Sequence, residues 1–334
     1  MPETFTSNNA AELAVVERSG FIESRHIGSA VVMAADGNVV TELGDINAPV
    51  YPRSSLKPFQ TIATLQSSVP LRGVQVALAS ASHVGSHEHM DVVQGMLKAA
   101  GLTADYLRCP ADWPKDEEAR NWLVRTERGR VRPAMNCSGK HAGFLWACVE
   151  NGWDLESYLD HDHPMQKRVV EVIEDYTGER IAHLGVDGCG APAPAVTLTG
   201  LARGISKLAK APGSKSSDAR AATVATAMLD YPWAVHGRGE SNSVVMDQLG
   251  IIAKTGAEGV MVMGTDKGVS VAVKMLDGAE RATSLVALTL LAAAGAIEPD
   301  KVAPVLEKVV PVTYGRGEPV GRVRLSSAVT ALLG

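Results

Sequence analysis

The sequence predicts a mixed α/β protein with a mainly antiparallel sheet flanked by helices, together with a helical lobe. Near the N-terminus, two Val-rich runs flank Asp36-Gly37, which is a strong signal for a β-hairpin. A second pair of apolar runs, late in the chain, turns at 265–268. Helical patterns dominate the segment between the two pairs. Strands at both ends of the chain therefore indicate one sheet built from both termini, with the helical lobe inserted between them.

The length and composition are those of an ordinary globular protein. Of its 334 residues, 46% are hydrophobic and 21% are charged, so the chain can form one large domain or two lobes. We assign 1–60 and 235–334 to the sheet lobe and 61–234 to the mostly helical lobe. The two lobes are expected to act as one functional unit with the site between them.

Charge and targeting signals exclude several classes of protein. The formal net charge of −5 argues against a general nucleic-acid surface. The N-terminus shows no basic and apolar signal segment, and the longest apolar run, 284–297, is shorter than the roughly 20 residues of a membrane span. The cysteines are scattered along the chain, which favours reduced thiols or metal ligands over a disulfide framework. We expect a soluble, cytoplasmic protein.

The predicted elements follow from these patterns in chain order. Strands are expected at 14–20 and 28–45, a short buried strand at 74–79, and a strand pair at 258–276. The predicted helices span 57–67, 90–100, 117–126, 139–151, 164–177, 194–210, 216–229 and 281–294.

Ser54 and Lys57 form a Ser-x-x-Lys pair in YPRSSLKPFQ. They lie on one face if a helix begins here, and Pro58 is tolerated in its first turn. A serine becomes nucleophilic when a neutral lysine can take its proton. The pair indicates serine–lysine chemistry, although an N-cap serine and an exposed lysine give the same spacing.

Ser82 and His83 follow the apolar run 74–79, where polar residues often form a site. Ser82 is therefore a candidate second hydroxyl. His83, His87 and His89 could bind a metal, but His87 and His89 are two residues apart and would face different sides of a helix. A solvated cap at a helix start is favoured over a three-histidine metal site.

Cys137 opens the segment NCSGKHAG, in which Gly139 can make a tight turn before a helix that ends at Gly152. A thiol at a helix N-terminus beside Lys140 is expected to have a lowered pKa. The resulting thiolate could attack carbon or bind a metal. A small, inert buried cysteine is the alternative.

Cys189 lies in a second glycine turn, VDGCGAP, two residues after Asp187. Two such thiols could share Zn²⁺ with a third ligand and leave a position for water. The paired Cys-x₂-Cys spacing of structural zinc sites is absent, so the spacing alone leaves the metal open.

Lys254 belongs to a Lys-Thr-Gly triplet just before the late strand pair. In penicillin-recognising enzymes an early Ser-x-x-Lys and a late Lys-Thr-Gly act together, and both occur here in that order. The glycine-rich HGRGES, at 236–241, is a plausible binding loop to which the sequence assigns no chemistry.

Together these segments resemble the rhizobial-type (class 3) L-asparaginase family, also called the asparaginase II family. The resemblance runs through VVERSGFIESRHIGSAVV, PRSSLKPFQ, ASHVGSHEH, NCSGKHAG, VDGCGAP and KTGAEGV, and no motif is found after Leu276. Each motif alone is weak, but six in order are specific. The resemblance implies a fold similar to that of serine β-lactamases and glutaminases, and a homodimer.

The resemblance also implies roles for individual residues. The serine–lysine pairs of the family map onto Ser54 with Lys57 and Ser82 with Lys254. Its zinc ligands map onto Cys137, Lys140 and Cys189. We expect the substrate to be bound by His83, Asp187 and Arg53.

The expected activity is hydrolysis of L-asparagine to L-aspartate and ammonia. Ser54 would attack the amide carbon with Lys57 as its base, while Ser82 and Lys254 relay protons and help to keep Lys57 neutral. Zinc would orient the substrate. A glutaminase- or β-lactamase-like hydrolase is the first alternative. The second is a catalytically silent, zinc-dependent amino-acid-binding protein, which would have no need for two serine–lysine pairs.

Overall fold

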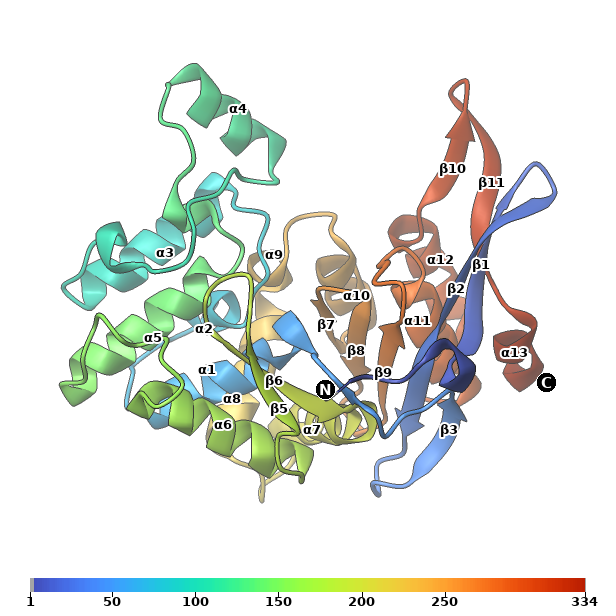
Figure 1. Cartoon of the computed structure of the whole chain (residues 1–334), viewed down its shortest axis with the longest axis horizontal. Helices are drawn as coiled ribbons and strands as arrows, with labels where there is room; N and C mark the ends of the chain where they lie inside the picture. The colour runs from blue at the N-terminus through green and yellow to red at the C-terminus, as the bar shows by residue number, and fades with distance from the viewer. Residues whose placement is uncertain (1–2, 334) are drawn as a thin grey trace.

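The computed structural model describes residues 3–333, and a large antiparallel sheet runs through its sheet lobe (Figure 1). Eight described strands form it in the order β10-β11-β1-β2-β9-β8-β7, with β3 paired to β2. Every pairing within it is antiparallel. The strands are β1 (Ala11–Arg18), β2 (Phe21–Met33), β3 (Val39–Leu43), β7 (Ile252–Gly256), β8 (Val260–Gly264), β9 (Ser270–Met275), β10 (Val312–Gly315) and β11 (Glu318–Leu325). The predicted sheet from both ends of the chain is therefore confirmed.

Helices cover both sides of this sheet (Figure 1). Helix α7 (Leu198–Lys210) packs against β2, β8 and β9 from the side of the helical lobe. On the other side, α11 (Thr283–Ala293) packs against β8 and β9 and is backed by α12 (Pro299–Val309). Because both faces are covered, β7, β8 and β9 are buried along their whole length.

The helical lobe surrounds α1 (Lys57–Gln66), whose first eight residues are buried. Helices α5, α6 and α8 pack against it. The other helices of the lobe are α2 (Val74–Ala79), α3 (His87–Ala99), α4 (Glu117–Arg125), α5 (Ser138–Asn151), α6 (Pro164–Thr177), α8 (Ala219–Asp230) and α9 (Pro232–Val235). Helix α10 (Ser241–Leu249) packs against β7 and α12 of the sheet lobe. A small sheet of β4 (Pro49–Val50), β6 (Pro192–Thr197) and β5 (His183–Val186) joins the lobes. The fold class is confirmed: a mixed α/β protein with an antiparallel sheet lobe and a helical lobe.

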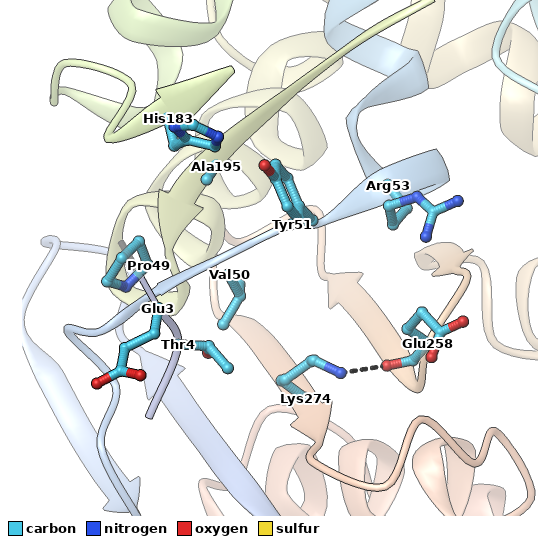
Figure 2. Close-up of a pocket in the computed structure, with 10 residues that line it drawn as sticks. All are labelled: Glu3, Thr4, Pro49, Val50, Tyr51, Arg53, His183, Ala195, Glu258 and Lys274. Atoms are coloured by element: carbon cyan, nitrogen blue, oxygen red, sulfur yellow. Dashed lines mark hydrogen bonds between the residues drawn. The ribbon is translucent and has the colours of Figure 1, made fainter. Parts of the chain in front are cut away.

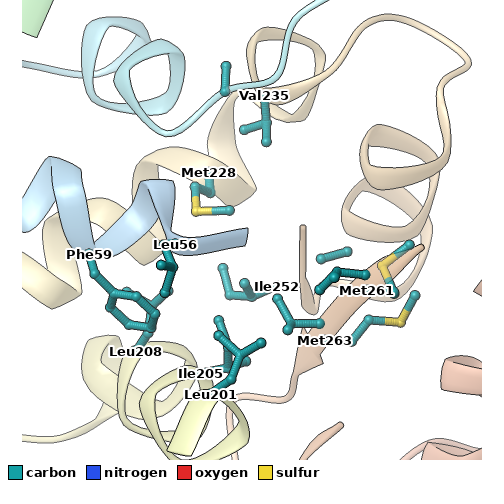
Figure 3. Close-up of a cluster of buried hydrophobic side chains, with 14 of the residues drawn as sticks. Leu56, Phe59, Leu201, Ile205, Leu208, Met228, Val235, Ile252, Met261 and Met263 are labelled. Carbon is teal, nitrogen blue, oxygen red and sulfur yellow. The ribbon is translucent and has the colours of Figure 1, made fainter. Parts of the chain in front are cut away.

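A buried cluster of apolar side chains joins α1 and α7 to the edge of the large sheet (Figure 3). Phe59 of α1 lies against Gly204 of α7, where an added Cβ would stand 2.9 Å from the Phe59 ring. Ile252 and Met263 reach the cluster from β7 and β8. The start of α1, which carries Lys57, is thus packed against the strands that carry Lys254.

Two predicted elements were wrong. Residues 74–79 form helix α2 and not a strand, because a short apolar run does not distinguish a buried strand from a buried helix. The predicted helix 194–210 begins only at Leu198, since Pro192–Thr197 is strand β6 and Thr197 caps the helix through its side chain. The sequence analysis also missed β10 and β11, which follow α12. Between residues 3 and 333, no helix is long and apolar enough to cross a membrane.

Candidate active site

Ser82 lies between two buried lysines. Lys254 Nζ donates to Ser82 Oγ at 2.8 Å, and Lys57 Nζ lies 3.1 Å from the same oxygen. Lys57 Nζ also donates to the main-chain oxygen atoms of Ala81 and Asn136. Both lysines are almost inaccessible, with 0% and 1% of their surface exposed at Lys254 and Lys57. One serine hydroxyl therefore connects the two predicted serine–lysine pairs.

A close approach of two main-chain segments brings these lysines together. The 3₁₀ helix η2 (Arg53–Leu56) carries Ser54 and leads into α1, and it packs against β7. At Gly256, next to Thr255 in the Lys-Thr-Gly triplet, an added Cβ would lie 2.1 Å from Pro52 O. Only a residue without a side chain allows this contact. The glycine of the triplet therefore has a packing role that its sequence context did not reveal.

Lys254 is the lysine that the structure predisposes to be neutral. Burial, followed by the nearby charge of Lys57, lowers the pKa of Lys254 well below its usual value. Its hydrogen-bond partners are Ser82 Oγ and Thr255 O, neither of which carries a negative charge. A neutral amine at this position can accept a serine proton.

Ser54 is partly exposed in η2, and its main-chain oxygen accepts a bond from the N–H of Lys57. Within residues 3–333 its hydroxyl forms no hydrogen bond. The structure thus places Ser54 one helical turn before Lys57, as the spacing predicts, but the lysine amine contacts Ser82.

His83 is buried next to Ser82 and has protein partners at both ring nitrogens. Its Nε2 lies 3.0 Å from Ser138 Oγ, and its Nδ1 accepts from the N–H of Gly85 at 3.2 Å. The ring stacks on His89, which forms a capping box with Ser86 at the start of α3. The predicted helix cap is therefore confirmed, but it is not solvated as expected, because His83 and His89 are buried.

Cys137, Lys140 and Cys189 meet at the start of α5. Lys140 Nζ lies 3.2 Å from Cys189 Sγ, and the Cys137 thiol donates to Asn136 Oδ1 at 3.0 Å. Cys137 is the N-cap residue of α5, and all three side chains are buried. Gly139 makes no tight turn here. It lies within the helix, where an added Cβ would stand 2.5 Å from Leu78 O.

The thiol with a lowered pKa is Cys189 and not Cys137, which corrects the expectation from the sequence. The neighbouring thiol of Cys137 and the charge of Lys140 lower the pKa of Cys189 to about 5, against the opposing effect of burial. The neighbouring Cys189 and burial raise the pKa of Cys137 to about 12. The helix N-terminus therefore does not decide which sulfur carries the charge.

This donor set fits a zinc ion. A thiolate at Cys189, a neighbouring thiol at Cys137 and an amine at Lys140 are three nitrogen and sulfur donors that converge on one place. In the described part of the chain, no group of three or more His, Cys, Asp or Glu side chains could hold a metal. Any zinc site here would consequently need the lysine as a ligand. Binding would also require the loss of protons from Lys140 and Cys137.

Asp187 connects Arg53 to the cysteine cluster. Arg53 Nε and Nη2 donate to Asp187 Oδ1 at 2.8 and 2.6 Å, while Asp187 Oδ2 lies 4.0 Å from Cys189 Sγ. Burial opposes ionisation, yet Lys140 and Arg53 lower the pKa of the Asp187 carboxyl. Arg53 has a left-handed main chain, φ 54°, which is uncommon for a residue with a side chain. The three predicted substrate-binding residues, Arg53, His83 and Asp187, thus surround the serine and cysteine clusters.

A cavity of about 280 Å³ opens on the sheet-lobe side of Arg53 (Figure 2). His183 of β5 and Tyr51, which follows β4, line one side of it. Lys274 of β9 and Glu258, in the turn between β7 and β8, line the other. Lys274 Nζ donates to Glu258 O. Burial lowers the pKa of Lys274. The sequence analysis did not single out these four residues.

The sequence analysis also missed two partners of the catalytic candidates. Asn136 supplies a main-chain oxygen to Lys57, and Asn242 binds Thr255, the residue after Lys254. Asn136 belongs to the motif NCSGKHAG, but main-chain contacts leave no signal in a sequence. Asn242 directly follows HGRGES, so that motif marked its location without revealing its role.

A partly exposed serine in contact with two buried lysines is suited to acyl transfer through a serine ester. A family model described as L-asparaginase II matches residues 14–325. The chain therefore belongs to the L-asparaginase II family. No curated protein is similar enough in sequence to match it.

Solved structures similar to this chain include two described as Mglu, in its glutamate form and in its native form. They have 16% and 15% sequence identity and TM-scores of 0.49 and 0.44. Each match covers 82% of this chain, but only 62% and 66% of the respective solved chain. A β-lactamase from Mycobacterium bovis matches 85% of this chain and 95% of its own, with 14% identity and a TM-score of 0.35. At these values the solved structures do not assign an activity to this chain.

Proposed function

We propose that this protein hydrolyses the side-chain amide of L-asparagine to L-aspartate and ammonia. Its membership in the L-asparaginase II family supports this substrate. The observation that carries the chemistry is the position of Ser82 Oγ, within hydrogen-bond distance of both Lys57 Nζ and Lys254 Nζ. Two amines joined through one hydroxyl can transfer a proton from the attacking group to the leaving group.

In the proposed first step, Lys57 passes a proton through Ser82 Oγ to the neutral Lys254, and Ser54 Oγ attacks the amide carbon while its own proton passes to the Lys57 amine freed in this way. The C–N bond then breaks, and the nitrogen leaves as ammonia after receiving a proton through Ser82 and Lys254. The product is an aspartyl ester of Ser54. In the second step, water attacks this ester and gives its proton to the same relay, which releases aspartate and restores the serine hydroxyl.

Ser54 is proposed as the nucleophile because the residue is partly exposed and its hydroxyl forms no hydrogen bond within residues 3–333. Ser82, in contrast, is held by two lysines, which suits a relay. The same contacts would allow Ser82 to be the nucleophile with Lys254 as its base. The two assignments predict an aspartyl ester on different serines, so mass spectrometry of the trapped ester distinguishes them.

We further propose that Cys137, Lys140 and Cys189 hold a zinc ion. When bound, zinc would supply a fixed positive charge that can orient the amino or carboxylate group of the substrate. Arg53 and Asp187 would support this region, because their ion pair lies between the zinc ligands and Ser54. His83 would keep the Ser82 segment in place through its contacts with Ser138 and Gly85.

The deciding experiment measures ammonia release from L-asparagine and L-glutamine, with and without added zinc, and hydrolysis of a chromogenic β-lactam. Turnover of asparagine alone supports the proposal, whereas preferred turnover of glutamine or the β-lactam supports the alternative hydrolases. Saturable asparagine binding without ammonia release would instead indicate a binding protein.

The matched variants are Ser54→Ala, Ser82→Ala and Ser55→Ala. Loss of the nucleophile is expected to lower kcat by about 10⁴-fold or more. Ser55 is a neighbouring buried serine whose hydroxyl donates to Pro52 O, so Ser55→Ala controls for packing of η2 and should keep most activity. Normal turnover by Ser54→Ala would mean that a residue other than Ser54 is the nucleophile.

The homodimer and the cytoplasmic location also remain proposals that rest on the family and on the sequence. Light scattering coupled to size-exclusion chromatography would test the dimer, and fractionation of the native cells would test the location. A monomer at micromolar concentration would contradict the proposed homodimer.

A further inference from the structure

The 235–242 segment, which contains HGRGES, has no role in the mechanism proposed above. It connects α9 to α10, and its main chain pairs with the segment that carries Ser82. The N–H of Ser82 donates to Val235 O at 2.9 Å, and the N–H of Val84 donates to His236 O at 2.8 Å. The first half of the segment thereby fixes the main chain of Ser82.

The hydroxyl of Ser243, in α10, holds the main chain of the 235–242 segment in place. The N–H of Gly237 donates to Ser243 Oγ at 3.3 Å, and the same hydroxyl donates to Pro232 O at 2.7 Å. An added Cβ at Gly237 would lie 2.8 Å from Val84 Cγ2, so the 235–242 segment lies directly against the segment that carries Ser82. These contacts make the 235–242 segment a rigid support and not a loop free to move.

The other end of the segment holds the strand that carries Lys254. Asn242 is completely buried and binds Thr255 twice, since Oδ1 accepts from the Thr255 N–H and Nδ2 donates to Thr255 Oγ1, both at 3.1 Å. Strand β7 is at the end of the large sheet, so this N–H has no neighbouring strand to bind. The Asn242 amide takes the place of that strand.

Thr255 connects Asn242 to the amine of Lys254. Lys254 Nζ donates to Thr255 O at 2.8 Å as well as to Ser82 Oγ at 2.8 Å. Asn242 holds Thr255 at its N–H and its hydroxyl, and this also restrains the Thr255 carbonyl oxygen. That oxygen is one of the two acceptors that orient the amine. The other acceptor, Ser82, is fixed by Val235 through the same segment.

We propose that Asn242 is a positioning residue for the serine–lysine relay: through Thr255 and the 235–242 segment it sets the distance between Lys254 Nζ and Ser82 Oγ. This inference rests on the proposed function, because it assigns Asn242 a part in the same proton transfer. Asn242 itself touches neither serine nor lysine side chain of the relay.

The charged and titratable groups that face Lys254 come from four directions. They are Lys57 at the start of α1, Cys137 at the start of α5, Glu280 before α11, and His236 of the 235–242 segment. No carboxylate forms a hydrogen bond with the amine in the described residues. A carboxylate at position 242 would be a new negative charge close to Lys254, and it would favour the protonated amine.

The test compares Asn242→Leu and Asn242→Asp with Asn151→Leu, using ammonia release from L-asparagine. Asn151 is a matched control, because its amide also makes two hydrogen bonds, to Ser67 O and Ala147 O, at the far end of α5. Asn242→Leu is expected to lower kcat about 10–100-fold with little change in KM, since the misplaced amine affects the transition state. Asn242→Asp should keep the hydrogen bond from the Thr255 N–H and accept a second one from the Thr255 hydroxyl. It should move the acid limb of the kcat profile to higher pH, by about one pH unit.

Equal losses of kcat in Asn242→Leu and Asn151→Leu, together with an unshifted pH profile in Asn242→Asp, would reduce Asn242 to a purely structural role. A second readout requires no substrate. The ¹⁵N signal of Lys254 Nζ, assigned by its absence in Lys254→Met, should titrate at higher pH in Asn242→Asp than in the wild-type protein. If the wild type hydrolyses no amide but this shift occurs, the proposed function fails while the coupling of position 242 to Lys254 stands.

Discussion

Lys254 and Lys140 are buried to the same degree, with 0% and 2% of their surfaces exposed, yet their pKa values shift in opposite directions. Burial and the charge of Lys57 lower the pKa of Lys254. Burial also acts against the charge of Lys140, but Cys189, Cys137 and Asp187 outweigh it and raise the pKa of this amine. The partners, and not the depth of burial, decide the protonation state.

The difference separates two chemical tasks that use the same type of residue. Lys254 faces a hydroxyl and a main-chain oxygen, so its neutral form can exchange a proton with Ser82. Lys140 faces a sulfur atom and stabilises the thiolate of Cys189. In the absence of metal, the second cluster is an ion pair, whereas the pKa shift at Lys254 favours a neutral amine beside the charge of Lys57.

The largest expected effect comes from removing the amine of Lys254. Lys254→Met should lower the kcat of asparagine hydrolysis by about 10²–10⁴-fold, which is the usual contribution of a general acid–base group. The fold should persist, because a methionine fills a similar volume without a polar group to bury. Ammonia release and a thermal melt measure the two effects together. Activity within fivefold of the wild type would exclude Lys254 from the relay.

Zinc affinity should respond to Lys140 in the same way that kcat responds to Lys254. Lys140→Met is expected to lower zinc affinity about 100-fold or more, because a ligand is lost and not only an outer contact, whose loss costs 10–100-fold. Lys274→Met is the control, since Lys274 is a largely buried lysine whose amine contacts only main-chain oxygens. Titration calorimetry would measure both affinities, and equal losses would contradict a ligand role.

The wild-type zinc affinity should also rise with pH. Binding needs a neutral Lys140 and a deprotonated Cys137, and the pKa values of both groups are raised in the structure. Metal binding must therefore release protons. Calorimetry in buffers with different ionisation enthalpies counts them, and release of less than one proton would mean that these groups do not bind the metal.

The family resemblance predicted that Ser82 and Lys254 lie in one site, although they are 172 positions apart, and the structure brings them into contact. It did not predict how the residues divide their roles, since the amine of Lys57 contacts Ser82 and not Ser54. The lowered thiol pKa was assigned to Cys137 from its place at a helix start, whereas the structure gives it to Cys189. Which of two coupled sulfurs is charged depends on the distance to Lys140 Nζ, and that distance is a tertiary property.

The missed parts of the fold have equally physical reasons. The run at 74–79 is apolar and short, so its helical conformation is determined by packing and not by a periodic pattern. Strands β10 and β11 are mostly exposed, which removes the apolar alternation on which strand prediction depends. Asn242 was missed because a buried amide that binds an edge strand looks like any polar residue in a sequence.

The free energy of unfolding should show a smaller, pH-dependent difference between wild type and Lys254→Met. Since the pKa of Lys254 is lowered in the folded protein, the unfolded chain binds the proton more tightly between the folded pKa and about 10.5. Stability from this group therefore rises with pH through that window and is lowest below it. Denaturant unfolding of both proteins across this range should show the greatest advantage of Lys254→Met at the acid end. A pH-independent difference would mean that Lys254 is not titrated on folding.

The smallest expected effects concern the two glycines that allow each cluster to form. An added Cβ would lie 2.1 Å from Pro52 O at Gly256 and 2.5 Å from Leu78 O at Gly139. Either alanine variant should cost about 1–3 kcal/mol of stability, because main-chain atoms must move apart. Gly256→Ala should also lower kcat, whereas Gly139→Ala should weaken zinc binding, since each displaces the lysine of its own cluster.

Gly95→Ala is the control: no atom lies within 4 Å of the added carbon in helix α3, so alanine should stabilise the protein by about 0.5–1 kcal/mol. If both variants changed kcat and zinc affinity equally, the clusters would be one coupled unit, and the separation of tasks between Lys254 and Lys140 would be wrong.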